Sequence, residues 1–216
     1  MVLSCVGCEM RFLITAGGTR EYLDPVRFLS NASSGKMGYA LARAALKAGH
    51  RVTLITAPTT LKPPTGAEIV QVESAAEMFE AVKKHWAKCD CLIMAAAVAD
   101  YTPAHPSKTK LKKQPTRLTL ELKPTPDILK WAGRQKRRDQ MLVGFALEDR
   151  DLRTNAEHKM REKNLDVIIA NTPGAIGADT STLHIKTIDS DWIEIANTHK
   201  TASSRRIIHM IAAHCV

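Results

Sequence analysis

The segment from Met10 to Gly49 constrains the fold most strongly, because it joins an apolar run to an amphipathic stretch through a long polar connection. Arg11 to Ala16 is mostly apolar and is closed by two glycines, which predicts a buried parallel strand. Lys36 to Lys47 carries its apolar residues at helical spacing and is followed by Gly49, which predicts a helix. The pattern indicates a strand–loop–helix unit of an α/β protein.

The connection between these two elements is longer than a strand-to-helix loop needs, and long loops in compact domains are usually functional. It ends in Ser33, Ser34 and Gly35, so free backbone N–H groups and the positive end of the helix dipole face out of the loop. Gly35 and Gly38 leave room for a ligand or a neighbouring strand. We interpret the connection as a phosphate-binding cradle; the alternative is that the serines only cap the helix.

Composition limits the possible classes of protein. A chain of 216 residues suffices for one α/β domain, and an aromatic content of 5% requires an aliphatic core. No apolar run approaches the ~20 residues of a membrane span. Met1 to Glu9 lacks the basic start of a signal peptide. We therefore expect a cytoplasmic protein with a tail over residues 1–9 and a single domain over residues 10–216.

The formal charge of +9 leaves two kinds of partner open, a nucleic acid or a polyanionic small substrate. The basic residues gather in Lys108 to Lys113 and in Arg134 to Arg138. No helix-turn-helix, zinc-finger or aromatic RNA-binding signature accompanies them. The charge therefore favours a small anionic substrate, and a basic nucleic-acid-binding module remains the alternative.

The five cysteines, an odd number, fit a reducing compartment. Cys5 and Cys8 form a C-x-x-C pair, but no second pair or histidine cluster follows at a zinc spacing. Zinc binding and redox chemistry are therefore disfavoured. Cys89 and Cys91 flank the start of an apolar run and are expected to be packing thiols.

The most apolar run, Asp90 to Val98, predicts a central strand buried on both faces. Asp100 follows its carboxyl end, where open α/β sheets bind ligands, although a helix cap or a structural ion pair is an equal alternative for this carboxylate.

The remaining apolar runs predict the other elements of the fold. Further strands are expected at Arg51 to Thr56, Ala67 to Val72, Met141 to Leu147 and Val167 to Ala170, with a hairpin at Leu183 to Ile188 and Trp192 to Ile195. Helices are expected at Ala75 to Ala87, Pro126 to Trp131 (with Thr125 as N-cap), Arg150 to Lys163 and Lys200 to His214.

Thr102 to Pro115 is rich in proline and lysine, so it cannot be core and predicts a mobile flap. Arg117 to Leu122 alternates between polar and apolar residues, which predicts a strand with one wet face. Together they predict a β excursion over about residues 102–123 that could serve in dimerisation.

These expectations describe a Rossmann-like, doubly wound α/β domain with a mostly parallel sheet. The strand ends supply Asn31, Asp100 and Asn171, and lysines from helices and flap suit the charge of a triphosphate. A nicotinamide-dependent oxidoreductase is disfavoured, because the strand ending at Thr56 lacks a following acid and G-x-G-x-x-G is missing. No Walker A, kinase or nucleophile-elbow sequence is present. The residues alone thus predict a nucleotide-using α/β enzyme.

Six motifs occur in fixed order along the chain. They are G-G-T-R-E with D-P-V-R-F (Gly17 to Phe28), S-N-A-S-S-G-K-M-G (Ser30 to Gly38), A-A-V-A-D-Y (Ala96 to Tyr101), K-L-K-K-Q (Lys110 to Gln114), P-D-I-L (Pro126 to Leu129) and G-F-A-L-E (Gly144 to Glu148). On these motifs, over nearly all of Met10 to Met210, the chain resembles the phosphopantothenate–cysteine ligases of coenzyme A biosynthesis. In bacteria this domain is commonly fused behind a flavin-dependent decarboxylase; the present sequence lacks that domain, so no flavin is expected.

The resemblance implies a reaction in two halves. The carboxylate of 4′-phosphopantothenate attacks the α-phosphate of CTP and releases pyrophosphate, and the amine of cysteine then displaces CMP from the acyl-cytidylate. Mg²⁺ would bridge the phosphate oxygens. Eukaryotic-type relatives prefer ATP, whereas the A-A-V-A-D-Y and K-L-K-K-Q motifs look like those of the CTP-using bacterial branch. The resemblance also implies a homodimer in which the flap completes the neighbour's site.

Site residues follow from the cradle and from the resemblance, and the ligands of the expected Mg²⁺ are left unassigned. Asn31 corresponds to the residue that handles the acyl-cytidylate, and Lys110 to the residue that helps to form it. The sequence departs from the family pattern at Thr172 to Gly174 and at Asp179 to Ser181. The expected nucleotide contacts are Gly17, Ser33, Ser34, Gly35, Met94, Ala95, Ala96, Asp100, Lys110, Pro126, Asp127, Ile128, Leu129, Phe145, Lys159 and Lys163, and the expected substrate contacts are Asn31, Ala97 and Asn171.

Overall fold

The apolar runs of the sequence form one eight-stranded sheet in the order β12-β11-β10-β9-β6-β1-β4-β5. This computed structural model describes residues 9–113, 115 and 117–214. Strands β5, β4, β1, β6, β9 and β10 are parallel to one another. Strand β11 runs antiparallel to β10, and β12 runs antiparallel to β11. The parallel strands follow the Rossmann order, so the predicted doubly wound, mostly parallel fold is confirmed. The strands are β1 (Arg11–Ala16), β4 (Arg51–Thr56), β5 (Glu68–Gln71), β6 (Cys91–Met94), β9 (Met141–Leu147), β10 (Val167–Asn171), β11 (Thr180–Thr187) and β12 (Ile193–His199).

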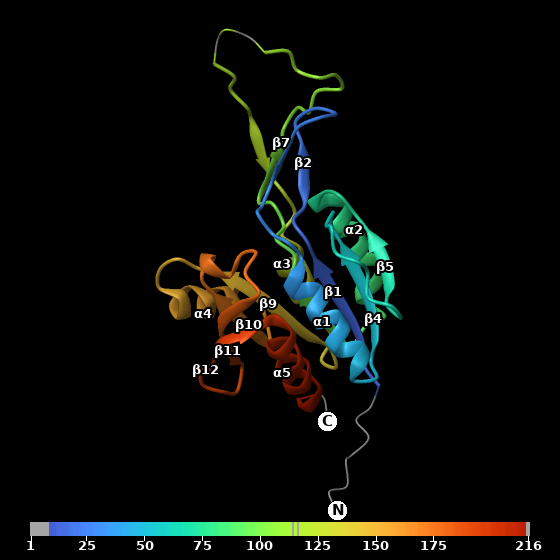
Figure 1. The fold of residues 1–216 in the computed structure, drawn as a ribbon, viewed down its shortest axis with the longest axis vertical. Helices are drawn as coiled ribbons and strands as arrows, with labels where there is room; N and C mark the ends of the chain where they lie inside the picture. Colours follow the sequence, from blue (N-terminus) through green and yellow to red (C-terminus); the bar gives the residue numbers. More distant parts are fainter. Residues whose placement is uncertain (1–8, 114, 116, 215–216) are drawn as a thin grey trace, which may run out of the picture.

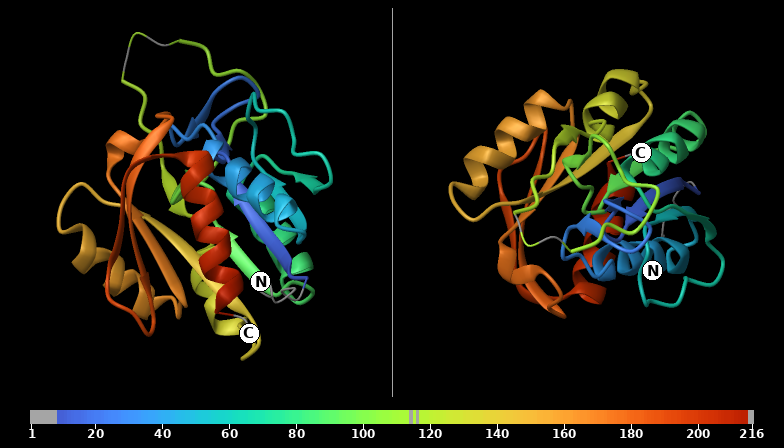
Figure 2. Two further views of the ribbon diagram at one scale, coloured as in Figure 1. Left: turned by 60° about the horizontal axis from the view of Figure 1, so that its bottom comes forward. Right: turned by 90° about the horizontal axis from the view of Figure 1, so that it is seen from above.

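Helices cover both faces of this sheet, and together they form the body of the molecule (Figures 1 and 2). On one face α1 (Lys36–Lys47) packs beside α5 (Lys200–Ala213); α1 covers β1 and β4, and α5 covers β11 and β12. On the other face lie α2 (Ala75–Trp86), α3 (Ile128–Gln135) and α4 (Leu152–Glu162). Because the central strands are buried on both sides, their side chains are mostly apolar and do not alternate between apolar and polar, as in other parallel sheets.

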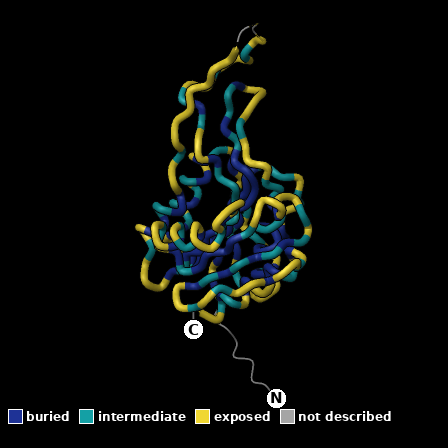
Figure 3. The backbone as a smooth tube through the Cα atoms, turned by 90° about the vertical axis from the view of Figure 1, so that its left-hand side faces the viewer, coloured by how far each residue is buried: buried dark blue, intermediate teal, exposed yellow. Residues whose placement is uncertain are grey.

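Two short hairpins project from the carboxyl end of the sheet and form an arm (Figure 1). In one, β2 (Arg20–Tyr22) pairs with β3 (Phe28–Ser30); in the other, β7 (Tyr101–Pro103) pairs with β8 (Leu122–Pro124). We call residues 20–30 and 101–124 the arm. The hairpins lie side by side, and Figure 3 shows many exposed residues along the arm, whereas the strands of the body are buried.

The arm contains two departures from the predictions. The connection predicted to be a loop between β1 and α1 contains the β2–β3 hairpin, whose strands are too short and too mixed in polarity to show a period. The strand predicted at Arg117 to Leu122 is wrong, because residues 117–121 are not in a strand and β8 begins only at Leu122. The alternation there reflects leucines that are exposed on the arm, Leu118 at 65% and Leu120 at 39%, and not one buried face.

Two further boundaries differ from the predictions. The helix predicted from Pro126 behind a Thr125 cap begins at Ile128, where the Asp127 carboxylate accepts from the Lys130 N–H at 2.9 Å. The Thr125 hydroxyl donates instead to the Ala99 carbonyl oxygen, at 2.6 Å. The strand predicted over Asp90 to Val98 ends at Met94, because the chain leaves the sheet there. The other predicted strands and helices are present with small differences at their ends.

Cys89 and Cys91 are buried, as expected of packing thiols. Burial, followed by the charge of Asp90, raises the pKa of the Cys89 thiol to about 12. Cys5, Cys8, residues 1–8 of the predicted tail and Gln114 of the K-L-K-K-Q motif lie outside the described residues. Within the described part of the chain, no helix combines the length and apolarity that crossing a membrane requires.

Candidate functional site

A cleft of about 650 Å³ opens at the carboxyl ends of the parallel strands, which is where doubly wound sheets bind ligands. Its volume lies within the range of small-molecule sites. The structure brings almost all of the predicted site residues to its walls; Gly17 and Lys110 are the exceptions. The predicted residues in the lining are Asn31, Ser33, Ser34, Gly35, Met94, Ala95, Ala96, Ala97, Asp100, Pro126, Asp127, Ile128, Leu129, Phe145, Lys159, Lys163 and Asn171.

The wall at the start of α1 agrees with the predicted cradle. Gly35 is the N-cap residue, with a left-handed φ of 74°, and no side chain caps the helix. The hydroxyl groups of Ser33 and Ser34 each accept only one long local hydrogen bond, from the N–H groups of Gly35 at 3.4 Å and Lys36 at 3.5 Å, respectively. The alternative in which the serines cap α1 is therefore wrong. A Cβ at Gly38 would lie 2.6 Å from the Ala16 Cβ, so this glycine lets the helix approach β1.

The wall after β6 is a backbone segment that is held by its neighbours. The Ala96 N–H donates to the Thr15 hydroxyl at 3.1 Å, and the Ala97 N–H donates to the Gly17 carbonyl oxygen at 2.8 Å. Ala99 N–H is bound by the Thr19 hydroxyl at 2.9 Å. Gly17 thus does not line the cleft but fixes a residue that does. A rigid segment of this kind suits recognition of a ligand by backbone groups.

Two lysines from α4 and its end, with a carboxylate at the start of α3, form another wall of the cleft. Lys159 donates to the Phe145 carbonyl oxygen at 2.8 Å, and Lys163 pairs with Asp127 at 2.9 Å. Burial, followed by the charge of Lys163, lowers the pKa of Lys159. Burial alone would raise the pKa of Asp127, but the N–H of Lys130 and the Lys163 ammonium outweigh it and lower the pKa. Two ammonium groups on one wall favour an anionic ligand, and the partly desolvated Lys159 gains most from it.

Polar side chains stand at the strand ends, as the sequence predicts. The Asn31 amide nitrogen donates to the Val98 carbonyl oxygen at 3.1 Å. Asp100 lines the cleft; it caps no helix and forms no ion pair with any described residue. Neither structural alternative for this carboxylate is therefore realised. The carbonyl oxygen of Asn171 accepts from the Glu148 N–H at 3.0 Å, which joins the ends of β9 and β10.

Two lysines of the cleft were not predicted. Lys36 donates to the Gly177 carbonyl oxygen at 3.1 Å and pairs with Asp179 at 2.7 Å. Lys200 is buried, and its ammonium donates to the carbonyl oxygens of Ala175, at 3.0 Å, and Ala178. Both hold the loop after β10, where the sequence departs from the family pattern. Lys36 could have been suspected from its place in the S-N-A-S-S-G-K-M-G motif, whereas nothing in the sequence marks Lys200 as buried.

Lys110 lies on the arm and is not part of the cleft lining in this chain. Among residues 9–113, 115 and 117–214, no group of three or more His, Cys, Asp or Glu side chains could hold a metal ion. The cleft of this chain thus has the size and the ammonium groups that suit an anionic ligand, and the lysine predicted for the first chemical step lies outside it.

Comparison with known proteins adds a family to this geometry. Residues 8–215 match the DNA/pantothenate metabolism flavoprotein C-terminal domain family. The chain is 48% identical over 206 residues to the coenzyme A biosynthesis bifunctional protein CoaBC of Bacillus subtilis (strain 168), covering 93% of this chain and 50% of that protein. It is 43% identical over 210 residues to a cysteine/cysteine sulfinic acid decarboxylase of an unknown prokaryotic organism, covering 93% and 58%.

The fold has a solved counterpart. The crystal structure of the C-terminal domain of a coenzyme A biosynthesis bifunctional protein CoaBC superposes with a TM-score of 0.84 at 41% identity, over 98% of both chains. The present chain spans about half the length of the curated relatives it matches.

Proposed function

The chain belongs to the DNA/pantothenate metabolism flavoprotein C-terminal domain family, and from this premise we propose that it is a CTP-dependent phosphopantothenate–cysteine ligase. The observation that carries the proposal is the composition of the cleft. Uncapped N–H groups of α1 and the ammonium groups of Lys159 and Lys163 face one space, which suits a nucleoside triphosphate. A site of this kind binds and orients the phosphate groups of the nucleotide. The proposed reaction needs no nucleophile from the protein.

In this mechanism the carboxylate of phosphopantothenate attacks the α-phosphate of CTP, and pyrophosphate leaves with the electrons of the broken bond. The start of α1 holds phosphate oxygens, and Lys159 and Lys163 offset their charge. The amine of cysteine then attacks the acyl carbon, CMP leaves, and the amine loses a proton as the amide forms. Asn31, at the mouth of the cleft, holds the acyl-cytidylate during this second step, since its carboxamide both donates and accepts.

We include Mg²⁺ in this proposal. Mg²⁺ is usually bound through one or two carboxylates together with substrate phosphates and water. The cleft fits that pattern, because Asp100 and Glu148 line it while Asp127 is engaged by Lys163. When bound, the ion neutralises charge on the triphosphate. The Glu148 carboxylate already accepts from the Asn155 side-chain amide at 3.1 Å, so Asp100 is the better candidate ligand.

The proposal includes a homodimer, because Lys110 lies outside its own chain's cleft. The arm exposes several large apolar side chains, which a second copy of the chain could cover. In the dimer, the arm of one protomer brings Lys110 to the cleft of its partner. We further propose a cytoplasmic location and no nucleic-acid or membrane partner. The exposed apolar residues of the arm are Val26, Phe28, Tyr101, Leu118, Leu120 and Leu122.

One assay tests the proposed activity against its rivals. The chain is incubated with phosphopantothenate, cysteine, Mg²⁺ and either CTP or ATP, and pyrophosphate is measured. Pyrophosphate release with CTP supports the proposal. Release with ATP alone would mean that ATP is the nucleotide substrate, and no release with either nucleotide would rule out the ligase activity. A nicotinamide-dependent reductase is disfavoured, because the buried Thr56 hydroxyl at the end of β4 is bound to Tyr39 at 3.1 Å. Steep salt-dependent DNA binding would favour the nucleic-acid module.

A further inference from the structure

Asp24, between β2 and β3, is an enclosed carboxylate of the arm, with a side chain that is 0% exposed. Its Oδ1 accepts from the N–H groups of Val26 at 2.8 Å and Arg27 at 2.9 Å. Its Oδ2 accepts from the Arg27 guanidinium at 2.9 and 2.5 Å. The same oxygen accepts a bond from the other hairpin, from the Leu111 N–H at 3.1 Å. One carboxylate therefore joins the two hairpins of the arm.

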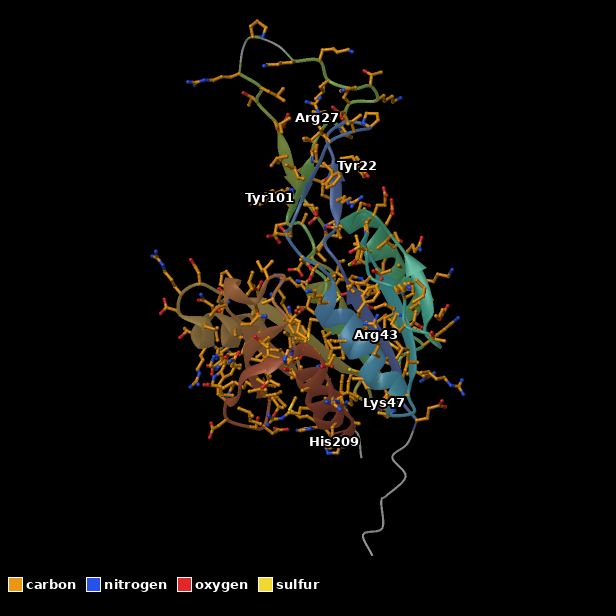
Figure 4. The ribbon with its side chains drawn as sticks, in the orientation of Figure 1. Tyr22, Arg27, Arg43, Lys47, Tyr101 and His209 are labelled. Carbon is orange, nitrogen blue, oxygen red and sulfur yellow. The ribbon has the colours of Figure 1, made fainter. Side chains whose placement is uncertain are left out.

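Arg27 binds the other backbone group of Leu111, its carbonyl oxygen. Its Nη2 donates to the carbonyl oxygen of Leu111 at 2.6 Å, so the ion pair binds both backbone groups of that residue. Nearby, the Ser107 N–H donates to the Leu23 carbonyl oxygen at 2.8 Å. Figure 4 shows Arg27 far out on the arm, beyond Tyr22 and Tyr101, where no helix of the body supports the chain.

This clamp acts on the peptide bond that links Lys110 to Leu111. The peptide group is planar, so a fixed N–H at Leu111 also fixes the plane that carries the Lys110 carbonyl and Cα. Residues 104–113 contain no strand or helix that could do so. Hydrogen bonds to a carboxylate are stronger than neutral ones, and enclosure strengthens them further.

We propose that Asp24, together with Arg27, is a positioning residue that sets the place of Lys110 in the reaction. The inference rests on the proposed role of Lys110 in forming the acyl-cytidylate. It assigns to the D-P-V-R-F segment a function outside the nucleotide cleft, because neither Asp24 nor Arg27 lines that cleft. The alternative is that the clamp only stabilises the arm.

A double-mutant cycle separates these possibilities. Asp24→Asn removes the charge but keeps one acceptor, and we expect a 10–100-fold slower release of pyrophosphate, since a small misplacement of a reacting group costs about that much. In a Lys110→Gln background the same change should have less than about a threefold effect, because it acts through Lys110. Losses that multiply in the double variant would overturn the proposal.

A control and a second variant guard against general unfolding. Asp139→Asn makes the same substitution in an exposed Asp–Arg pair, with Arg137, just before β9, and should leave the rate unchanged. Arg27→Lys keeps the charge but loses the planar fork that reaches both Asp24 and Leu111, so we expect an intermediate loss. If Asp24→Asn does not fold, Arg27→Lys enters the cycle in its place.

Hydrogen exchange of the full chain tests the clamp without any turnover. In the Asp24→Asn protein, or in its Arg27→Lys replacement, the amide of Leu111 should exchange on the order of tenfold faster, while amides of β6 should not change. Unchanged exchange at Leu111 overturns the clamp even if the chain is a ligase. A wild-type chain that exchanges as expected but releases no pyrophosphate overturns the proposed function instead.

Discussion

The cleft and the arm are held by different forces. The walls of the cleft begin at the ends of buried parallel strands and at the start of a packed helix, so the hydrophobic core of the body fixes them. The arm consists of two antiparallel hairpins with strands of three residues each; the enclosed Asp24 carboxylate and its partner Arg27 join them, and apolar side chains are exposed. In the proposed ligase, the body therefore provides the binding site, and the arm provides Lys110, whose placement decides its effect.

The largest effect should follow from removing that lysine. Lys110→Gln is expected to lower pyrophosphate release and ligation together by about 10²–10³-fold, because the ammonium interacts most strongly with charge that develops as the carboxylate attacks. Lys113→Gln, on the same segment and equally exposed, is the matched control and should change the rate little. Single-turnover assays with labelled CTP measure both. Equal losses in the two variants would mean that the arm contributes only general positive charge.

Asn31 belongs to the cleft, and its replacement should affect the second half of the reaction. Asn31→Asp removes a hydrogen-bond donor and places negative charge beside an anionic intermediate, so we expect a loss of ~2–4 kcal/mol in the cysteine step. Some pyrophosphate should still be released, and the acyl-cytidylate should accumulate when products are separated with and without cysteine. If Lys110→Gln accumulates the intermediate and Asn31→Asp does not, the two roles are reversed.

Mixing these two variants tests whether the arm serves its own cleft or that of its partner. If Lys110 acts in trans, a heterodimer of Lys110→Gln and Asn31→Asp protomers has one site with both intact residues. Random mixing then restores about a quarter of the wild-type rate, since half of the dimers are mixed and half of their sites are whole. Coexpression followed by assay of the mixture measures the recovery. Activity no higher than that of either variant alone would place both residues in the same chain's site.

The contrast between body and arm also explains what the sequence could predict. The strands β1, β4 and β9 and the helix α1 were predicted to the residue, because long apolar runs and helical spacing reflect a buried environment. The cradle and Asp100 could be proposed because strand ends are recognisable once the strands are known, and residues of both line the cleft. The short hairpin strands were missed, since three residues of mixed polarity carry no period.

Other features depend on contacts between distant residues. Lys200 is buried only because the loop after β10 folds over it, and Asp24 is enclosed only because residue 111 returns to it from the second hairpin. The alternation at residues 117–122 was a false strand signal, because regularly spaced leucines look the same in a sequence whether they are buried or exposed. Local propensity cannot distinguish these cases, because each depends on residues that are distant in the sequence.

The smallest expected effect concerns the electrostatics of the cleft. Burial, and then Lys163, lower the pKa of Lys159 below its ordinary 10.5, while a bound triphosphate stabilises the charged form. The affinity for a non-hydrolysable CTP analogue should therefore fall as the pH rises through this lowered pKa, by at most about tenfold per pH unit. Lys159→Arg should remove the fall, and Lys163→Gln should move it to higher pH, since it removes the neighbouring positive charge.

Folding stability should move in the opposite direction, and this identifies the group. A lysine whose pKa is lowered in the folded state binds fewer protons there than in the unfolded chain, so its contribution to the free energy of unfolding rises with pH between the lowered pKa and 10.5. Titration calorimetry and denaturant unfolding from about pH 7 to about pH 9.5 measure the two quantities on the same protein. If affinity and stability fall together, titration of another group, or loss of the fold, governs the cleft, and Lys159 is not its pH-sensitive cation. If they diverge in the wild type but not in Lys159→Arg, charge on this wall of the body binds the nucleotide independently of the arm.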